Sequence, residues 1–306
     1  MRGFVALFPW IPLPLFSVFT RVAIELTFIL LWKYRKRMEE NLSLAMGREF
    51  PTREERRGLI HRAWRNFGQV VFETTCILFA SREEIRSLVD VRGEEHLRQA
   101  LARGKGVIAL SAHLGNFTLI GARLAVGGYP FSVVVKQPRD RRFAGLIDHY
   151  RARLGMGTIS AKPRREAARQ VLRTLRRNEV VLLIADEFKS GGVQVEFLGR
   201  MAAAPRGPVT LAMRTGAAVL PMFITRDLED RLTLYIRPGL DLVKTGDLQE
   251  DVAANATVFS RQLEDMVRRY PDQWNWLGFH RDGRRPRSEI GRPQTVPPNP
   301  EVRVSP

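Results

Sequence analysis

Between about Glu39 and Arg103, apolar positions recur at helical spacing while charged residues fill the opposite positions. This period predicts amphipathic helices. Thr52 followed three residues later by Glu55 matches a capping box, which indicates a helix beginning at this point. The apolar stripe that follows this start consists of Leu59, Trp64, Phe67, Val70 and Val71.

Beyond Gly104 the pattern changes to short apolar runs rich in β-branched residues, alternating with amphipathic segments of ten or so residues. Strands that alternate with helices of this length predict an α/β fold built on a central sheet. The segments, in chain order, are 106–112, 119–126, 131–136, 143–153, 165–176, 180–185, 210–215, 219–225, 232–237 and a helical stretch from about 251 to 270.

The N-terminal segment from Gly3 to Trp32 is almost wholly apolar, but prolines and the charged pair Arg21 and Glu25 interrupt it. A spanning helix needs about 20 uninterrupted apolar residues. A basic cluster follows at 33–37, which is typical of a flank facing the cytoplasm and anionic headgroups. We therefore predict a hydrophobic membrane anchor over residues 1–38. The alternative is an apolar helix within the domain, with Arg21 and Glu25 paired on one face.

The chain has 306 residues, 49 Lys+Arg against 32 Asp+Glu, and a formal net charge of +17, with 44% hydrophobic residues. This composition excludes a disordered or collagen-like chain, and the lone Cys76 excludes an internal disulfide. The charge indicates an anionic partner such as a membrane surface or a phosphorylated substrate. No metal-ligand spacing, phosphate loop or recognition-helix sequence is present, so we predict no metal, no cofactor and no nucleic-acid partner.

His113 stands at the end of the predicted strand 107–112 and enters a turn that leads to a helix. In α/β sheets, functional groups collect at the carboxyl ends of strands. A histidine there can accept a proton from a hydroxyl near neutral pH, although it can also simply cap a helix or fill the turn.

Residues 111–117, Ser-Ala-His-Leu-Gly-Asn-Phe, resemble the GHxGNWE block of the bacterial lipid A biosynthesis acyltransferases, the lauroyl and myristoyl transferases within the lysophospholipid acyltransferase superfamily. The resemblance covers about residues 30–281. Further blocks that resemble the family's, in order, are 35–42, 64–68, 179–187, 191–200, 207–212 and 270–277.

This resemblance implies a glycerol-3-phosphate acyltransferase-like fold with a mixed central sheet flanked by helices. It implies an acyltransferase domain over 39–283, which the residue pattern divides into a helical part, 39–103, and an α/β part, 104–283. The composition of the residues from Arg284 onward, with their Pro, Arg and Ser, predicts a disordered basic, Pro-rich tail at 284–306. The resemblance further implies a membrane-bound enzyme at the cytoplasmic face of the bacterial inner membrane. Such an enzyme moves a fatty acyl chain from acyl carrier protein or acyl-CoA to a glycolipid or lysolipid hydroxyl, with His113 as general base.

The chain departs from the family where an acidic residue, five positions after the histidine, orients the imidazole. That position is Thr118. A threonine hydroxyl can accept the imidazole N–H but carries no charge. We expect Asp186 or Glu187, at the end of the strand 180–185, to supply the missing charge, because the ends of parallel strands share one rim of the sheet. The alternative is a non-catalytic lipid-binding or assembly protein that kept the fold.

Four further residues are candidates for substrate binding. The N–H groups of Gly115 and Asn116 could face an oxyanion, or the two residues could simply form the turn. Arg165 aligns with an arginine that the family uses near its acceptor or donor, and a solvated helix face is the alternative. Arg206 is a candidate for an acceptor phosphate, since guanidinium makes bidentate bonds to such groups.

Overall fold

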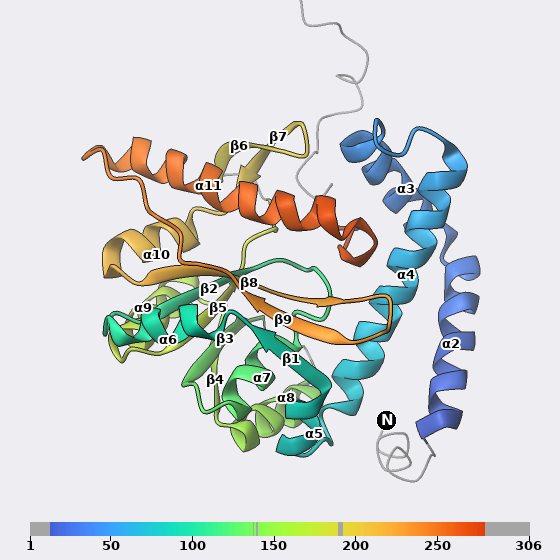
Figure 1. The fold of residues 1–306 in the computed structure, drawn as a ribbon, viewed down its shortest axis with the longest axis horizontal. Helices are drawn as coiled ribbons and strands as arrows, with labels where there is room; N and C mark the ends of the chain where they lie inside the picture. Colours follow the sequence, from blue (N-terminus) through green and yellow to red (C-terminus); the bar gives the residue numbers. More distant parts are fainter. Residues whose placement is uncertain (1–12, 137, 139, 189–191, 279–306) are drawn as a thin grey trace, which may run out of the picture.

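The computed structural model describes residues 13–136, 138, 140–188 and 192–278. A seven-stranded sheet runs through the centre in the order β1-β9-β8-β2-β5-β3-β4, with the helices packed around it (Figure 1). Among these strands the β8–β9 pair is antiparallel and the other neighbours are parallel, so the sheet is mixed, as predicted. The strands are β1 (Val89–Arg92), β2 (Val107–Ser111), β3 (Phe131–Val135), β4 (Met156–Ser160), β5 (Val180–Ile184), β8 (Ala218–Arg226) and β9 (Leu232–Ile236).

β2 lies at the middle of the sheet, and every one of its residues is buried. A parallel strand covered on both faces needs this continuous apolar sequence. Its register with β5 pairs Ser111 with Ile184, and the N–H of Ala185 continues the ladder by donating to the Ser111 carbonyl at 2.8 Å. The residues that follow these two strands therefore leave the sheet side by side.

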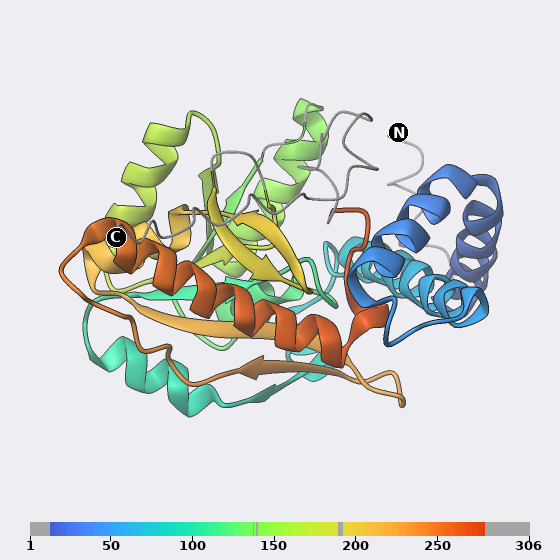
Figure 2. The ribbon, with the colours of Figure 1, turned by 90° about the horizontal axis from the view of Figure 1, so that it is seen from above.

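Two apolar clusters fill the spaces on either side of the sheet. The first packs α9, α10 and α11 with the hairpin of β6 (Val193–Phe197) and β7 (Arg200–Ala204), and the second packs α5 to α8. Figure 2 shows α11 lying along one side of the sheet. These helices are α5 (Arg82–Leu88), α6 (Glu94–Ala102), α7 (Leu119–Val126), α8 (Arg141–Leu154), α9 (Arg164–Arg176), α10 (Gly207–Thr215) and α11 (Leu248–Arg269), which the short η2 (Pro271–Gln273) follows.

The described part of the chain begins with α2 (Leu13–Leu30), α3 (Trp32–Met46) and α4 (Arg53–Cys76), and α5 follows them before β1. The capping box predicted at Thr52 and Glu55 is confirmed at the start of α4. β1 lies within the stretch 39–103 that was predicted to be helical, because β9 supplies it with a partner strand. The predicted tail 284–306 lies outside the described residues.

The hydrophobic anchor predicted over residues 1–38 is not supported. In the described part of the chain, no helix combines the length and apolarity needed to cross a membrane. Instead α2 runs alongside α4 (Figure 1), and its Glu25 lies 2.7 Å from His61 and 3.3 Å from Arg65 of that helix. A charge within the apolar run thus serves to attach α2 to the domain. Residues 1–12 of the predicted anchor lie outside the described residues.

Candidate active site

His113 and Asp186 form the centre of the site, two residues beyond the ends of β2 and β5. The His113 ring nitrogen Nδ1 lies 2.8 Å from Oδ1 of Asp186, and the main-chain N–H of His113 donates to Oδ2 at 2.8 Å. The His113 side chain is 31% exposed, whereas that of Asp186 is 3% exposed. The carboxylate therefore holds both the backbone and the ring of a partly exposed histidine.

Asp186 is held in its charged form despite its burial. Burial by itself raises the pKa of the carboxyl group, but hydrogen bonds from the His113 ring, from the Trp274 indole and from the His113 main chain outweigh burial, so that the pKa lies below its ordinary value. The Trp274 bond, Nε1 to Oδ2, measures 2.9 Å. Facing an ionised carboxylate, Nδ1 carries the ring proton, and the lone pair of the neutral imidazole is then on Nε2.

Of the two acids predicted to pair with His113, Asp186 is the one that lies against the histidine ring. Glu187, the next residue, is exposed. The hydroxyl of Thr118, the third candidate for orienting the ring, donates to Asn116 Oδ1 at 2.6 Å and lies 2.7 Å from the Thr74 hydroxyl.

Gly115 and Asn116 form the turn itself. Gly115 has φ +53°, and a Cβ at this position would lie 1.8 Å from the Ile224 carbonyl oxygen, so only glycine fits. Its N–H donates to the Gln273 carbonyl at 2.8 Å and is thereby engaged within the protein. Asn116 is 1% exposed. The prediction that these two residues bind substrate through their N–H groups is therefore not supported for Gly115, and the structure buries Asn116 beneath the turn.

The segment 272–276 draws together several of the blocks noted in the sequence. Asn41 of α3 donates to the Trp276 carbonyl at 2.6 Å, and Asn66 of α4 donates to the Asp272 carbonyl at 2.8 Å. The N–H of Asn275 donates to the His113 carbonyl at 3.0 Å. Sequence reasoning missed the function of this segment, because nothing in its residues shows which loop it covers.

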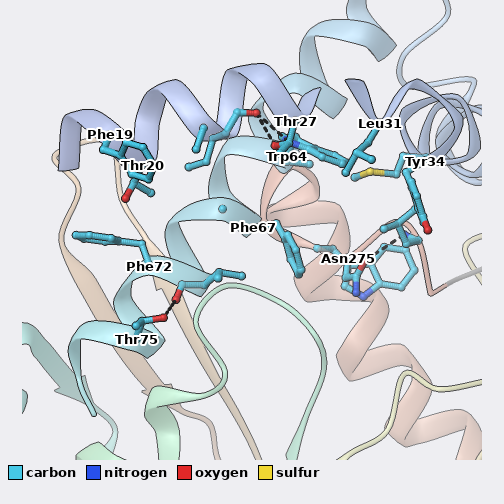
Figure 3. Close-up of a pocket in the computed structure, with 18 residues that line it drawn as sticks. Phe19, Thr20, Thr27, Leu31, Tyr34, Trp64, Phe67, Phe72, Thr75 and Asn275 are labelled. Atoms are coloured by element: carbon cyan, nitrogen blue, oxygen red, sulfur yellow. Dashed lines mark hydrogen bonds between the residues drawn. The ribbon is translucent and has the colours of Figure 1, made fainter. Parts of the chain in front are cut away.

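A large apolar cavity lies between α2 and α4, with a volume of about 750 Å³. Figure 3 shows Phe19, Thr20 and Thr27 of α2, with Leu31 directly after this helix, on one wall and residues of α4 such as Phe72 opposite. A smaller cavity of about 70 Å³ contains His113, Gly115 and Phe117 in its lining. Both cavities share the lining residues Ala63, Phe67, Trp274 and Asn275. The small cavity that His113 lines therefore adjoins the large apolar one.

The two candidate arginines lie elsewhere. Arg165 is exposed in the first turn of α9, and Arg206 is exposed at the N-cap of α10. Neither lines either of the two cavities described above. Within the residues that the structure describes, no group of three His, Cys, Asp or Glu side chains could hold a metal ion.

Comparison with known proteins places the chain in a family. The family model described as "Bacterial lipid A biosynthesis acyltransferase" matches residues 3–281. Phosphatidylinositol mannoside acyltransferase of Mycolicibacterium smegmatis is 29% identical over 65% of this chain and 66% of its own length. The Mycobacterium tuberculosis protein of that name is 30% identical over 61% and 58%. Lipid A biosynthesis acyltransferase of Haemophilus influenzae is 26% identical over 80% and 74%.

The chain thus aligns with 66% and 58% of the length of these two mycobacterial relatives, less than two thirds of either. The family model, in contrast, extends over nearly the whole chain and includes α2, the His113 turn, Asp186 and the segment 272–276. The chain belongs to the bacterial lipid A biosynthesis acyltransferase family.

Proposed function

We propose that this protein is an acyltransferase that moves a fatty acyl chain from a thioester donor, acyl carrier protein or acyl-CoA, to a hydroxyl of a glycolipid or lysolipid, with His113 as general base. The observation that carries the proposal is the His113–Asp186 pair, whose histidine lines a small cavity that shares four lining residues with an apolar cavity of about 750 Å³. The relatives' names, which refer to lipid A and to a phosphatidylinositol mannoside, support a glycolipid acceptor.

The reaction needs a base that removes one proton from the acceptor hydroxyl and later returns it to the leaving thiolate. Nε2 of His113 removes the proton of the acceptor hydroxyl, whose oxygen attacks the thioester carbonyl carbon. The new C–O bond forms, the C–S bond breaks, and the leaving thiolate takes the proton back from the imidazolium. Asp186 keeps Nδ1 protonated and opposes the positive charge that develops on the ring. General base catalysis of this kind contributes about 10²–10⁴-fold to a rate.

The apolar cavity between α2 and α4 suits the acyl chain. Each methylene transferred from water into such a space contributes about 0.8 kcal/mol to binding. Phe67 and Trp274 line both this cavity and the smaller one that contains His113, so a chain held among them would present its carbonyl end toward the histidine. This arrangement keeps the reactive end at the polar group and the tail away from water.

The outer surface of α2 and α3 supports binding to a membrane surface, and we place the protein at the cytoplasmic face of the bacterial inner membrane. Ile29 and Leu30 are 65% and 71% exposed, and Trp32 is 52% exposed. Exposed Lys33 and Arg37 follow directly in α3. Apolar side chains beside basic ones are typical of a helix lying in the interface of an anionic leaflet.

Vesicle sedimentation tests this placement. Wild-type protein should sediment with vesicles that contain phosphatidylglycerol, and the double variant Lys33→Glu, Arg37→Glu should remain in the supernatant at moderate salt. Retention of the double variant on the vesicles would contradict the contribution of the basic cluster.

Acyl transfer is tested by incubating the full-length protein and mixed lipid acceptors with labelled acyl carrier protein or labelled acyl-CoA. We expect transfer by the wild type, loss to background in His113→Ala, and a decrease of about 10²–10⁴-fold in Asp186→Asn. Glu187→Gln is the matched control and should keep nearly the full rate. Wild-type activity in His113→Ala would overturn the site. Lipid binding without transfer from either donor would favour the non-catalytic alternative.

A further inference from the structure

A second, largely buried ionic pair lies beside the His113 turn. Glu73 of α4 pairs with Arg226 at the end of β8, and their side chains are 9% and 13% exposed. The two residues lie 153 positions apart in the chain. Burying two such charges costs several kcal/mol per ion before their attraction is counted, so the contacts that the pair makes deserve a functional explanation.

The Glu73 carboxylate holds the turn through Asn116. Asn116 Nδ2 donates to Glu73 Oε2 at 2.7 Å, and the Asn116 Oδ1 accepts the Thr118 hydroxyl at 2.6 Å. Since the Thr118 proton is committed to Asn116, the Thr74 hydroxyl donates to Thr118. The bonds therefore run in one direction, from Thr74 through Thr118 and Asn116 to the single negative charge on Glu73.

Arg226 holds the same turn from the other side. Its main-chain N–H donates to Gln273 Oε1 at 2.9 Å, and Gln273 Nε2 donates back to the Arg226 carbonyl at 2.7 Å. The Gln273 carbonyl accepts the N–H of Gly115 at 2.8 Å. The Glu73 carboxylate thus contacts Asn116 directly, and the main chain of Arg226 is linked through Gln273 to Gly115; these are the third and second residues after His113.

We infer that Glu73 and Arg226 are positioning residues for His113: they hold the turn 113–118 so that Nε2 meets the acceptor hydroxyl while Asp186 holds Nδ1. This inference rests on the proposed function. It also explains how the neutral Thr118 fits beside Asn116: the Asn116 oxygen accepts the Thr118 hydroxyl, and the Asn116 NH₂ donates to the carboxylate of Glu73 on α4. The pair acts through the backbone of the turn and touches no reacting atom.

The inference is tested by moving the negative charge from one side of the Asn116 amide to the other. The variants are Glu73→Gln, Thr118→Asp and the double variant that combines them. Glu73→Gln removes the charge, and we expect kcat to fall about 10²-fold with little change in KM, the cost of a displacement of about 1 Å in a catalytic group. Thr118→Asp alone places two carboxylates around one amide and should also lower kcat. In the double variant, the Asn116 amide can rotate, donating to the new carboxylate and accepting from the new glutamine. We expect the double variant to recover at least about tenfold over Glu73→Gln, a coupling that independent effects cannot produce.

Two controls separate positioning from loss of structure. Arg226→Lys keeps the charge and should retain more kcat than Arg226→Gln. Asp265 lies on α11 and pairs with Arg237, and neither residue belongs to the turn 113–118. Asp265→Asn removes this ion pair and should leave kcat unchanged. All variants are compared well below their unfolding midpoints, which are measured by circular dichroism.

A readout without turnover keeps this inference distinct from the proposed function. The proton between His113 Nδ1 and Asp186 should give a downfield NMR resonance, assigned by its absence in His113→Gln. We expect Glu73→Gln to shift or broaden this resonance and the double variant to restore it. An unchanged resonance together with an unchanged kcat in Glu73→Gln would overturn the inference. A wild type that shows the resonance and its dependence on Glu73, but transfers no acyl group, would overturn the proposed function alone.

Discussion

The indole N–H of Trp274 donates to Oδ2 of Asp186 at 2.9 Å, the same oxygen that accepts the main-chain N–H of His113 at 2.8 Å. The other oxygen, Oδ1, faces the His113 ring. One buried carboxylate therefore joins the ends of two neighbouring strands to a segment 88 residues further along the chain. Its charge is stabilised by three donors at once, which makes Trp274 part of the machinery that orients the base.

Trp274→Phe should lower kcat by about tenfold, because one hydrogen bond to a charged group is worth about 1.5–3 kcal/mol and the remaining two donors still hold Asp186. Trp276→Phe is the matched control. It also loses an indole hydrogen bond, from Nε1 to the Pro271 carbonyl at 2.7 Å, but this bond does not involve Asp186. Steady-state kinetics should show a larger loss of kcat in Trp274→Phe than in Trp276→Phe. Equal losses would contradict the role of Trp274 in orienting His113 through Asp186.

The depressed pKa of Asp186 predicts how stability changes in acid. In the unfolded chain the carboxyl group titrates near 3.8, and in the folded protein it titrates lower. Its contribution is therefore fully present above the unfolded value and is lost as the pH falls through the folded value. Urea unfolding of the wild type and Asp186→Asn from pH 6 to pH 2.5 should show a difference in unfolding free energy that narrows below about pH 4. A difference that stays constant over this range would refute the depressed pKa.

Gly115→Ala should abolish activity and destabilise the fold, because its Cβ would lie 1.8 Å from the Ile224 carbonyl oxygen. We expect a loss of about 3 kcal/mol or more in unfolding free energy. Gly104→Ala is the control: Gly104 also has a positive φ, of +70°, but nothing lies within 4 Å of the added atom. It should cost only about 1–2 kcal/mol and leave the rate unchanged. Similar losses of unfolding free energy in the two variants would show that local movement relieves the steric contact at Gly115.

Thr20→Phe should shift the preference of the enzyme toward shorter acyl chains. Thr20 lines the large cavity away from the residues shared with the His113 cavity, so a larger side chain there shortens the space for the tail (Figure 3). At about 0.8 kcal/mol per methylene, excluding two carbons changes the ratio of kcat/KM by about tenfold. Competition between donors of two chain lengths measures the ratio. Val18→Phe, on an exposed part of the same helix, should leave it unchanged.

Local sequence determined most of the helices and strands, and it identified His113 of the His113–Asp186 pair. Helical spacing and the Thr52–Glu55 capping box are properties of neighbouring residues, and both predict α4 correctly. The apolar run that becomes β2 indicates a buried strand, and that strand places His113 at its carboxyl end. These inferences succeed because helix period, caps and strand burial depend on residues a few positions apart.

Only the tertiary structure distinguished Asp186 from Glu187 as the partner of His113, because the register of β2 with β5 decides which of two adjacent acids faces the ring. It also brought Trp274 onto Asp186 and Glu73 onto Asn116. The same packing attached α2 to α4 through Glu25, where the apolar run alone had predicted a membrane anchor. Each of these contacts joins residues distant in the chain, and the pattern of neighbours along a chain carries no measure of which distant groups will meet.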